Sequence, residues 1–373
     1  MGLMAARTGA ATQPPVAGST DSAWLTPLRA DVLAAVTEFL DTRCRDTLRG
    51  AHVDIAEDVL RGLLAEGKCV RSSYLYLGWQ CGAPVSAATV RAAASLELLH
   101  AFALVQDDVM DESDMRRGRP SAHRAFQRWH QERGLPGSPA RFGESAAVLL
   151  GDLCLVWAEQ MLRESGVDGA ALSRAWPRYD AMRTELAVGQ FADLVNDSAG
   201  FPSLTDVLDV ARRKSGNYTV RRPLEIGAAL AGCDDAVLDV LGRYGEAIGE
   251  AFQLRDDLLG VFGAPATTGK PTGTDLIARK ATTVVVAGYE LASGAQQRQF
   301  KEFMTADHLG SDDVTRWQAL IKEVGTVQWI ENMIVERVNA AVEVLSSLGP
   351  ADVAPDARSA LITMASACTE RTA

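Results

Sequence analysis

The sequence lacks the closely spaced cysteines and histidines that hold zinc in small metal sites. It contains six cysteines, and no two of them form a CxxC pair. They are scattered along the chain, at Cys44, Cys69, Cys81, Cys154, Cys233 and Cys368. Scattered single cysteines are typical of proteins from a reducing compartment. We therefore expect a protein of such a compartment, with no zinc site.

Positive charge is also in short supply. The chain has 37 Lys and Arg against 48 Asp and Glu, which gives a formal net charge of −11. A general nucleic-acid binder needs a basic surface to contact phosphates, so we expect no nucleic-acid partner. If the ligand is an anion, the cations that bind it must be gathered locally.

Segments that direct a chain to a membrane are missing as well. The first residues contain no apolar run of the kind found in signal peptides. The most apolar stretch, residues 145–162, contains Asp152 and Glu159, which disfavours a membrane span. We therefore expect a cytoplasmic protein without a transmembrane segment.

Strand patterns are absent, and helical patterns take their place. From about Trp24 onward, apolar residues recur at three- and four-residue intervals, which predicts helices. Breakers rich in Gly and Pro separate the segments at 134–139, 198–203 and 263–275. These features predict an all-α fold of about ten or more helices. We expect one domain over residues 23–350, a disordered tail at 1–22 and a C-terminal segment at 351–373.

Two clusters of aspartates stand out, each at the end of a long apolar helical run. In "LVQDDVMDESDMRRGRP" (104–120), Asp107 and Asp111 lie one turn apart on one helix face, with Asp108 beside them. The second cluster, in "AFQLRDDLLGVFG" (251–263), consists of Asp256 and Asp257. Carboxylates are unfavourable near a helix C-terminus, where the dipole is negative. The repeated arrangement predicts a bound cation, and oxygen ligands favour Mg²⁺.

Basic residues accompany both clusters. Arg116 and Arg117 follow the first cluster, and Lys270 and Lys280 follow the second. Other polar residues are ordinary when taken singly, and a lone histidine on an apolar helix face is more often a core residue than a ligand contact. This weaker group comprises Lys68, Arg71, His100, Gln190 and Lys214.

Taken together, these residues resemble the trans-polyprenyl diphosphate synthase family over about residues 28–348. The family's first aspartate-rich motif, DDxxD followed by four residues and RRG, is intact from Asp107 to Gly118. "EGKCVRS" (66–72) is similar to the family's GGKxxRP, and "VGQFADL" (188–194) to its GQxxDL. "KSGNYTV" (214–220) is similar to its KT-containing helix, with Ser215 in place of Thr. The resemblance implies a single-domain isoprenoid synthase-type helical bundle with a central active-site cavity.

The second aspartate-rich motif departs from the family pattern. It is usually DDxxD, but here Gly260 stands in place of the last Asp. Asp256 and Asp257 remain, and the first Asp of this motif does most of the metal binding in the family. We therefore expect the motif to function, and Gly260→Asp to change activity only modestly.

The resemblance implies a prenyltransferase that joins isopentenyl diphosphate head-to-tail (1′–4) to an allylic diphosphate: dimethylallyl, geranyl or farnesyl. It implies a homodimer and three Mg²⁺ ions per site, held by Asp107, Asp108, Asp111, Asp256 and Asp257. Arg116, Lys214 and Lys280, with Lys270, are expected to stabilise the leaving diphosphate. The catalytic residues are then Asp107, Asp111, Arg116, Lys214, Asp256 and Lys280. Lys68, Arg71, His100 and Arg117 are expected to hold isopentenyl diphosphate, and further substrate contacts are expected from Gln190, Ser215 and Gln253.

Product length is expected to depend on Phe102 and Ala103, which precede Asp107 by about one helical turn. In the family, bulky residues at these two positions set the floor of the pocket. Aromatics at both are typical of farnesyl (C15) synthases, whereas one aromatic with a small partner is compatible with C20. The resemblance therefore favours a geranylgeranyl diphosphate synthase, with a C15 or other chain-length synthase as the alternative.

Two other functions are compatible with a helical, aspartate-rich chain. A class I terpene cyclase uses a similar first motif, but Gly260 and Ala264 fall where its second motif needs Ser or Thr and Glu. A non-catalytic partner subunit usually loses an aspartate motif or the binding cations, and nearly all of them are present here. Both alternatives are therefore less favoured than an active synthase.

Overall fold

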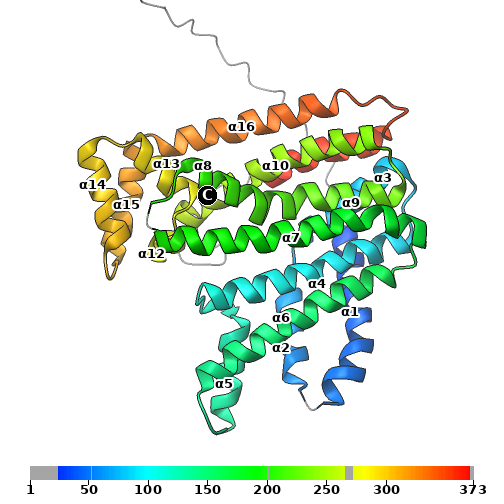
Figure 1. Cartoon of the computed structure of the whole chain (residues 1–373), viewed down its shortest axis with the longest axis horizontal. Coiled ribbons are helices and arrows are strands. Elements are labelled where there is room, and N and C mark those ends of the chain that lie inside the picture. The colour runs from blue at the N-terminus through cyan, green and yellow to red at the C-terminus, as the bar shows by residue number, and fades with distance from the viewer. Residues whose placement is uncertain (1–23, 52, 200, 265–271, 370–373) are drawn as a thin grey trace, which may run out of the picture.

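The structure is a computed structural model that describes residues 24–51, 53–199, 201–264 and 272–369. Long helices run side by side through the molecule, and α12–α15 gather at one end of it (Figure 1). The helices are α1 Leu25–Arg43, η1 Cys44–Arg49, α2 Ile55–Leu64, α3 Val70–Gly82, α4 Ala87–Met110, α5 Ala122–Glu132, α6 Pro139–Arg163, α7 Gly169–Ala199, α8 Leu204–Val210, η2 Ala211–Arg221, α9 Arg222–Ala231, α10 Asp235–Phe262, α12 Thr274–Ile277, α13 Thr283–Leu291, α14 Gly294–Thr305, α15 Ser311–Glu323, α16 Thr326–Leu345 and α17 Pro355–Thr369. The strands β1 Met115–Arg116 and β2 Arg119–Pro120 form a minimal hairpin. The all-α prediction is confirmed.

The two aspartate clusters lie near the C-terminal ends of α4 and α10. The α4 helix starts at Ser86, whose side chain accepts a hydrogen bond from the backbone N–H of Thr89. The α10 helix starts at Asp234, which caps the N–H of Val237 in the same way at 2.9 Å. A capping side chain satisfies a donor that the first helical turn leaves unpaired. The local sequence thus fixes where each long helix begins, and the length of each helix carries its aspartates to the same end of the bundle.

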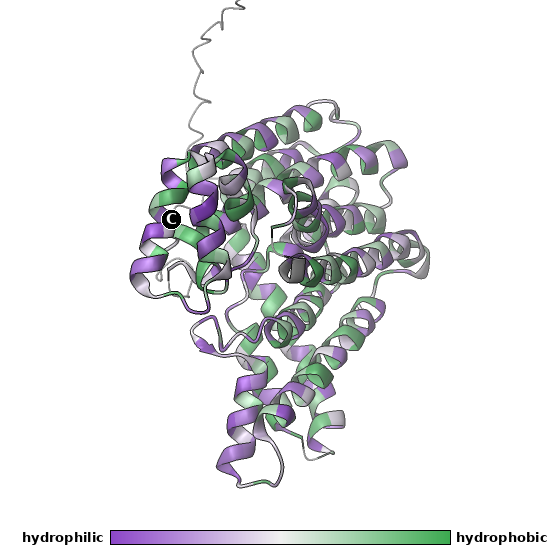
Figure 2. Ribbon diagram, turned by 60° about the vertical axis from the view of Figure 1, so that its left-hand side comes forward, coloured by the Kyte–Doolittle hydropathy of each residue, from purple (hydrophilic) through white to green (hydrophobic). Residues whose placement is uncertain are grey.

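Two clusters of buried apolar side chains hold the helices together. The larger cluster includes most of the buried faces of α1, α3, α4, α6 and α9. The smaller one lies under α12–α16 and includes Trp317, which is fully buried and stacks on Phe303 with ring centroids 5.2 Å apart. Apolar and polar residues alternate along the helices (Figure 2), as amphipathic packing requires. The smaller apolar cluster therefore supports the C-terminal end of α10.

The C-terminal helix α17 is part of the bundle. It packs against α3, α10 and α16, and Leu361 and Ala365 are completely buried. The Tyr244 hydroxyl of α10 donates a hydrogen bond to the carbonyl of Leu361 at 2.7 Å. Arg255, next to Asp256, donates to the carbonyl of Thr369, also at 2.7 Å. The expected C-terminal segment is therefore packed onto α10 as far as Thr369, whereas the expected tail at 1–22 lies outside the described residues.

Helices α4 and α6 are long and apolar enough, by length and composition, to cross a membrane. They pack against each other, and the most apolar parts of α4 and α6 are 61% and 44% buried inside the fold. Their apolar residues therefore serve as core residues, although α6 also leaves Leu149 and Val156 exposed.

The cysteines whose side chains are described form no disulfide with one another. Cys44, Cys69, Cys81 and Cys154 are buried free thiols, and Cys233 is partly buried. Burial raises the pKa of the Cys81 thiol to about 12 and that of Cys44 to about 11. A protonated, buried thiol is a poor nucleophile and a poor metal ligand, so these cysteines act as core residues.

Candidate active site

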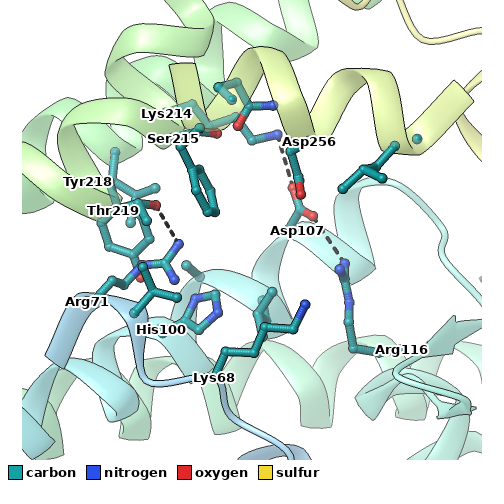
Figure 3. Close-up of a pocket in the computed structure, with 18 of the residues that line it drawn as sticks. Lys68, Arg71, His100, Asp107, Arg116, Lys214, Ser215, Tyr218, Thr219 and Asp256 are labelled. Carbon is teal, nitrogen blue, oxygen red and sulfur yellow. Dashed lines mark hydrogen bonds and ion pairs between the residues drawn. The ribbon is translucent and has the colours of Figure 1, made fainter. Parts of the chain in front are cut away.

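A cavity of about 450 Å³ opens between α3, α4, α7, η2, α10 and α12. It brings together most of the residues that the sequence predicted (Figure 3). The predicted residues that line it are Lys68, Arg71, His100, Ala103, Asp107, Arg116, Arg117, Gln190, Lys214, Ser215, Gln253 and Asp256. Residues from five segments distant in sequence thus meet in one place.

One face of α4 forms a wall of the cavity. His100, Ala103, Leu104 and Asp107 line it, at the spacing of successive helical turns. Phe102 does not line it, but packs against the larger apolar cluster. Five residues advance a helix by about 500°, which places Phe102 roughly 140° away from Asp107 around the axis. Phe102 is therefore not among the residues that line the cavity, and its expected effect on product length stays a prediction.

The RRG sequence after the first motif forms the β1–β2 hairpin. Arg117 and Gly118 form its tip, and both have positive φ, 51° and 72°, the pattern of a two-residue type I′ turn. The hairpin directs Arg116 back toward α4, where its guanidinium contacts Asp108 at 3.0 Å and Asp107 at 3.3 Å. Arg117 points the other way and donates to the carbonyl of Leu63 at 2.8 Å. The glycine of the motif is thus needed for the turn, and the turn separates the two arginines.

Asp108 is an anchor for Arg116 rather than part of the cavity wall. Its carboxylate is buried and accepts hydrogen bonds from Arg116. Burial by itself lowers the pKa of Arg116, but the hydrogen bonds and charge of Asp108 outweigh that effect and keep the guanidinium charged. Removing one partner of a buried pair of this kind typically lowers the free energy of unfolding by about 3–5 kcal/mol, because the other charge is left uncompensated.

Lys214, which belongs to the π-helical segment η2, lies between two carboxylates from other helices. Its ammonium lies 2.6 Å from Asp193 and 3.1 Å from Asp107. Burial disfavours the charged lysine, but Asp107 and Asp193 outweigh burial and raise its pKa. Lys280 makes a corresponding ion pair with Asp111. Neither Asp111 nor Lys280 is among the lining residues, so the pair closes the site from behind Asp107.

The opposite side of the cavity carries Lys68, Arg71 and His100. The Arg71 guanidinium lies over the Tyr218 ring, 4.3 Å from its centroid, and donates to the Thr219 hydroxyl at 2.9 Å. Its buried Nε has no hydrogen-bond partner. Burial lowers the pKa of His100 well below its usual range, and the nearby arginines lower it further, so the imidazole is neutral. Its Nδ1 is also buried without a partner, so both residues offer unused polar atoms at the cavity.

The two aspartates of the second aspartate cluster lie in different surroundings, one in the cavity and one in the core. Asp256 lines the cavity, whereas Asp257 is buried, accepts hydrogen bonds from Gln253 at 2.6 Å and from the N–H of Thr283 at 3.1 Å, and does not line it. Burial raises the pKa of Asp257 to about 7 despite these hydrogen bonds. Asp257 therefore holds Gln253 in place and is not placed to contact a ligand directly. Lys270 lies outside the described residues.

Several lining residues were not singled out in the sequence. Tyr218 and Thr219 position Arg71, and Asp275 lies beside Gly260. Asp193, which does not line the cavity, positions Lys214. Asp193 belongs to the "VGQFADL" motif, so its spacing from Gln190 was an available signal. Tyr218 and Thr219 likewise belong to the "KSGNYTV" motif, whereas Asp275 becomes a functional candidate only once the helices are packed.

The donor set suits Mg²⁺ shared with a phosphate ligand. Across the described ranges, no group of three or more His, Cys, Asp or Glu residues converges to hold a metal alone. Mg²⁺ is commonly bound by one or two carboxylates together with substrate phosphates, so a closed protein cage is not required. Asp107 and Asp256 provide such carboxylates from two helices, and both line the cavity. The residues therefore fit the metal.

Comparison with known proteins gives a family for this site. Residues 53–321 match the model of the polyprenyl synthetase family. The chain is 34% identical to geranylgeranyl diphosphate synthase of Mycobacterium tuberculosis over 75% of each chain, and 30% identical to a (2E,6E)-farnesyl diphosphate synthase of the same organism over 77% of this chain and 75% of that protein. Among solved structures, it is similar to geranylgeranyl pyrophosphate synthase from Corynebacterium glutamicum, complexed with isoprenyl diphosphate and magnesium. That similarity has a TM-score of 0.88 and 34% identity, over 93% of this chain and 99% of the other.

The fold and the site thus define an enzyme of isoprenoid chain elongation. The chain belongs to the polyprenyl synthetase family and is a prenyltransferase. The resemblance drawn from the sequence motifs is confirmed.

Proposed function

We propose that this enzyme condenses isopentenyl diphosphate with an allylic diphosphate and that it requires Mg²⁺. The observation that carries this proposal is that Asp107 and Asp256, from separate helices, line one cavity together with Arg116 and Lys214. Mg²⁺ bound there supplies Lewis-acid charge that stabilises the departing diphosphate. We propose three ions per site, as in the family resemblance.

The allylic diphosphate belongs at the aspartate side of the cavity. Arg116 and Lys214 are fixed there by Asp108 and Asp193, so their positive charge is already in position when the C–O bond breaks. Preorganised charge costs no reorganisation at the moment of reaction and so stabilises the transition state more than a mobile side chain does. Lys280, held by Asp111, adds charge from behind.

Isopentenyl diphosphate belongs at the opposite side, with Lys68, Arg71, His100 and Arg117. These residues hold a diphosphate without metal, so the bound molecule is not ionised and its double bond remains available as the nucleophile. A planar guanidinium suits bidentate contact with phosphate oxygens. The neutral His100 can donate from one nitrogen and accept at the other. We propose that the released diphosphate takes up the proton that is lost after the condensation.

We propose a C20 product, geranylgeranyl diphosphate. The growing chain passes Ala103, which lines the cavity one turn from Asp107 and leaves space that an aromatic residue would fill. Leu104, Leu186 and Phe252 continue the apolar lining and shield the carbocation from water. A C15 product remains the second candidate, since some relatives are farnesyl diphosphate synthases.

Mass spectrometry of the products, with each allylic primer supplied in turn, tests this assignment. We expect the wild-type enzyme to stop mainly at C20, and Ala103→Phe to shorten the product toward C15. Phe102→Ala changes the neighbouring position and serves as the comparison. We expect it to change product length less than Ala103→Phe does, because Phe102 packs against the larger apolar cluster. A wild-type product of C15, or an unchanged profile in Ala103→Phe, contradicts the assignment.

We also propose a cytoplasmic homodimer built on α6 and α7. The ion pair of Arg183 with Glu159, at 3.0 Å, joins these two helices. Both expose large apolar side chains, with Leu149 64% exposed and Phe191 72% exposed. Exposed apolar residues on neighbouring long helices are what a dimer interface requires, because its buried core is more apolar than ordinary surface.

A further inference from the structure

A carboxylate from another helix occupies the space that Gly260 leaves. Gly260 lies one turn after Asp256, on the same face of α10. A Cβ placed on Gly260 would stand 1.8 Å from Oδ2 of Asp275 and 2.7 Å from its Cγ. Non-bonded atoms do not approach that closely. The Asp275 carboxylate therefore lies where the side chain of the missing third aspartate would begin.

The chain holds Asp275 in this position through α12. Leu276 is fully buried in the smaller apolar cluster, which fixes the turn against α10 and α15. The backbone N–H of Lys280 donates to the carbonyl of Asp275 at 2.9 Å. The same short helix thus presents a carboxylate to the cavity and sets the start of the segment that carries Lys280.

Gly260 and Asp275 both line the cavity, beside Gln253 and Asp256. The opposite wall carries Asp107, whose Oδ1 lies 3.1 Å from the Lys214 ammonium. Asp275, from α12, therefore faces the cavity from the same side as Asp256.

We propose that Asp275 supplies the third carboxylate of the second aspartate motif, in place of the residue at position 260. It would hold Mg²⁺ directly or through a metal-bound water, on the α10 side of the diphosphate. The proposal rests on the Mg²⁺-dependent function proposed above. In this chain, glycine at 260 is then a requirement of the arrangement, because any side chain there displaces Asp275.

This geometry revises the sequence expectation for Gly260→Asp. Adding the usual aspartate forces two carboxylates into one space, with both steric overlap and like-charge repulsion. We expect a strong loss of metal binding, and not the modest change predicted from the motif alone. Gly260→Ala tests the steric part separately, because it adds only the Cβ.

The test measures Mg²⁺ binding in the presence of inorganic pyrophosphate by isothermal titration calorimetry, and does not depend on turnover. We expect Asp275→Asn and Gly260→Ala each to weaken apparent Mg²⁺ affinity by about 10- to 100-fold, the usual cost of losing a metal-site partner. The double variant Gly260→Asp with Asp275→Gly exchanges the two positions and should recover most of the loss. Asp239→Asn, on the exposed surface of the same helix, is the control and should bind as the wild type does.

The outcomes separate the possible explanations. Wild-type affinity in Asp275→Asn overturns the proposal and leaves Asp275 as a packing residue. A double variant no better than Gly260→Asp also overturns it, because the carboxylate is then not interchangeable between the two positions. If Asp275→Asn fails to fold by circular dichroism, Gly260→Ala decides, since it retains the carboxylate and only moves it. If the wild type itself binds no Mg²⁺ with pyrophosphate, the proposed metal dependence fails instead.

Discussion

Replacing Arg71 should separate the two substrates of the enzyme. Its guanidinium is held over Tyr218 and by Thr219, and its buried Nε has no hydrogen-bond partner among the residues that the structure describes. A hydrogen bond to a charged group contributes about 1.5–3 kcal/mol. One tenfold change corresponds to about 1.4 kcal/mol, so Arg71→Ala should raise the KM for isopentenyl diphosphate roughly 10- to 150-fold.

The assay varies each substrate while the other is saturating. We expect the KM of the allylic diphosphate to change much less, because its diphosphate belongs to Arg116 and Lys214 on the other side. Arg71→Lys keeps the charge but loses the planar donor pair, so its effect should be intermediate. Thr219→Val removes the hydroxyl that orients Arg71 and should have a small effect in the same direction. Equal increases in both KM values would refute the division of the cavity into two diphosphate sites.

Three further predictions address the metal, the histidine and the assembly. Asp107→Asn or Asp111→Asn should lower kcat at least about 100-fold, because each loses charge that holds the metal and its cations; near-normal turnover at saturating Mg²⁺ would exclude the assignment. The pKa of His100 is below 6.5 in the folded protein, so as the pH falls below about 6.5 the unfolded chain binds the proton first and the protein loses stability. In thermal unfolding measured against pH, His100→Asn should therefore lose less stability on acidification than the wild type does. Identical pH profiles would argue against a neutral His100. Phe191→Glu should give a monomer by light scattering, whereas Val335→Glu, on a similarly exposed apolar residue of α16, should leave the dimer intact; a dimer in both variants would place the interface elsewhere.

Much of the site could be predicted because it lies on regular helices. The repeat of apolar residues indicates α4 and α10, and the 100° step per residue places His100, Ala103 and Asp107 on one face. The same step also places Phe102 away from Asp107, so its exclusion from the cavity was implicit in the sequence. Motif spacing identified about half of the lining residues, and on α4 it reflects this periodicity.

The remaining roles depend on packing between segments distant in sequence. Whether Asp108 and Asp257 face the cavity or the core depends on which neighbour covers them, and the sequence does not give that neighbour. Asp108 meets Arg116 only because a positive-φ turn reverses the chain. The relation between Gly260 and Asp275 arises from a contact between α10 and α12, which no pattern within either segment indicates.

The packing of α17 has a practical consequence for handling the enzyme. The family match ends at residue 321, yet α10 is braced by the carbonyl groups of Leu361 and Thr369 in α17. An expression fragment that ends at residue 321 would lack α17 and its contacts with the helix that carries Asp256. The apolar surface exposed in this way would favour aggregation. An affinity tag fused directly after Thr369 would crowd the same contact. A fragment that runs through α17, with its tag at the other end, preserves the contacts of α17 with the helix that carries Asp256.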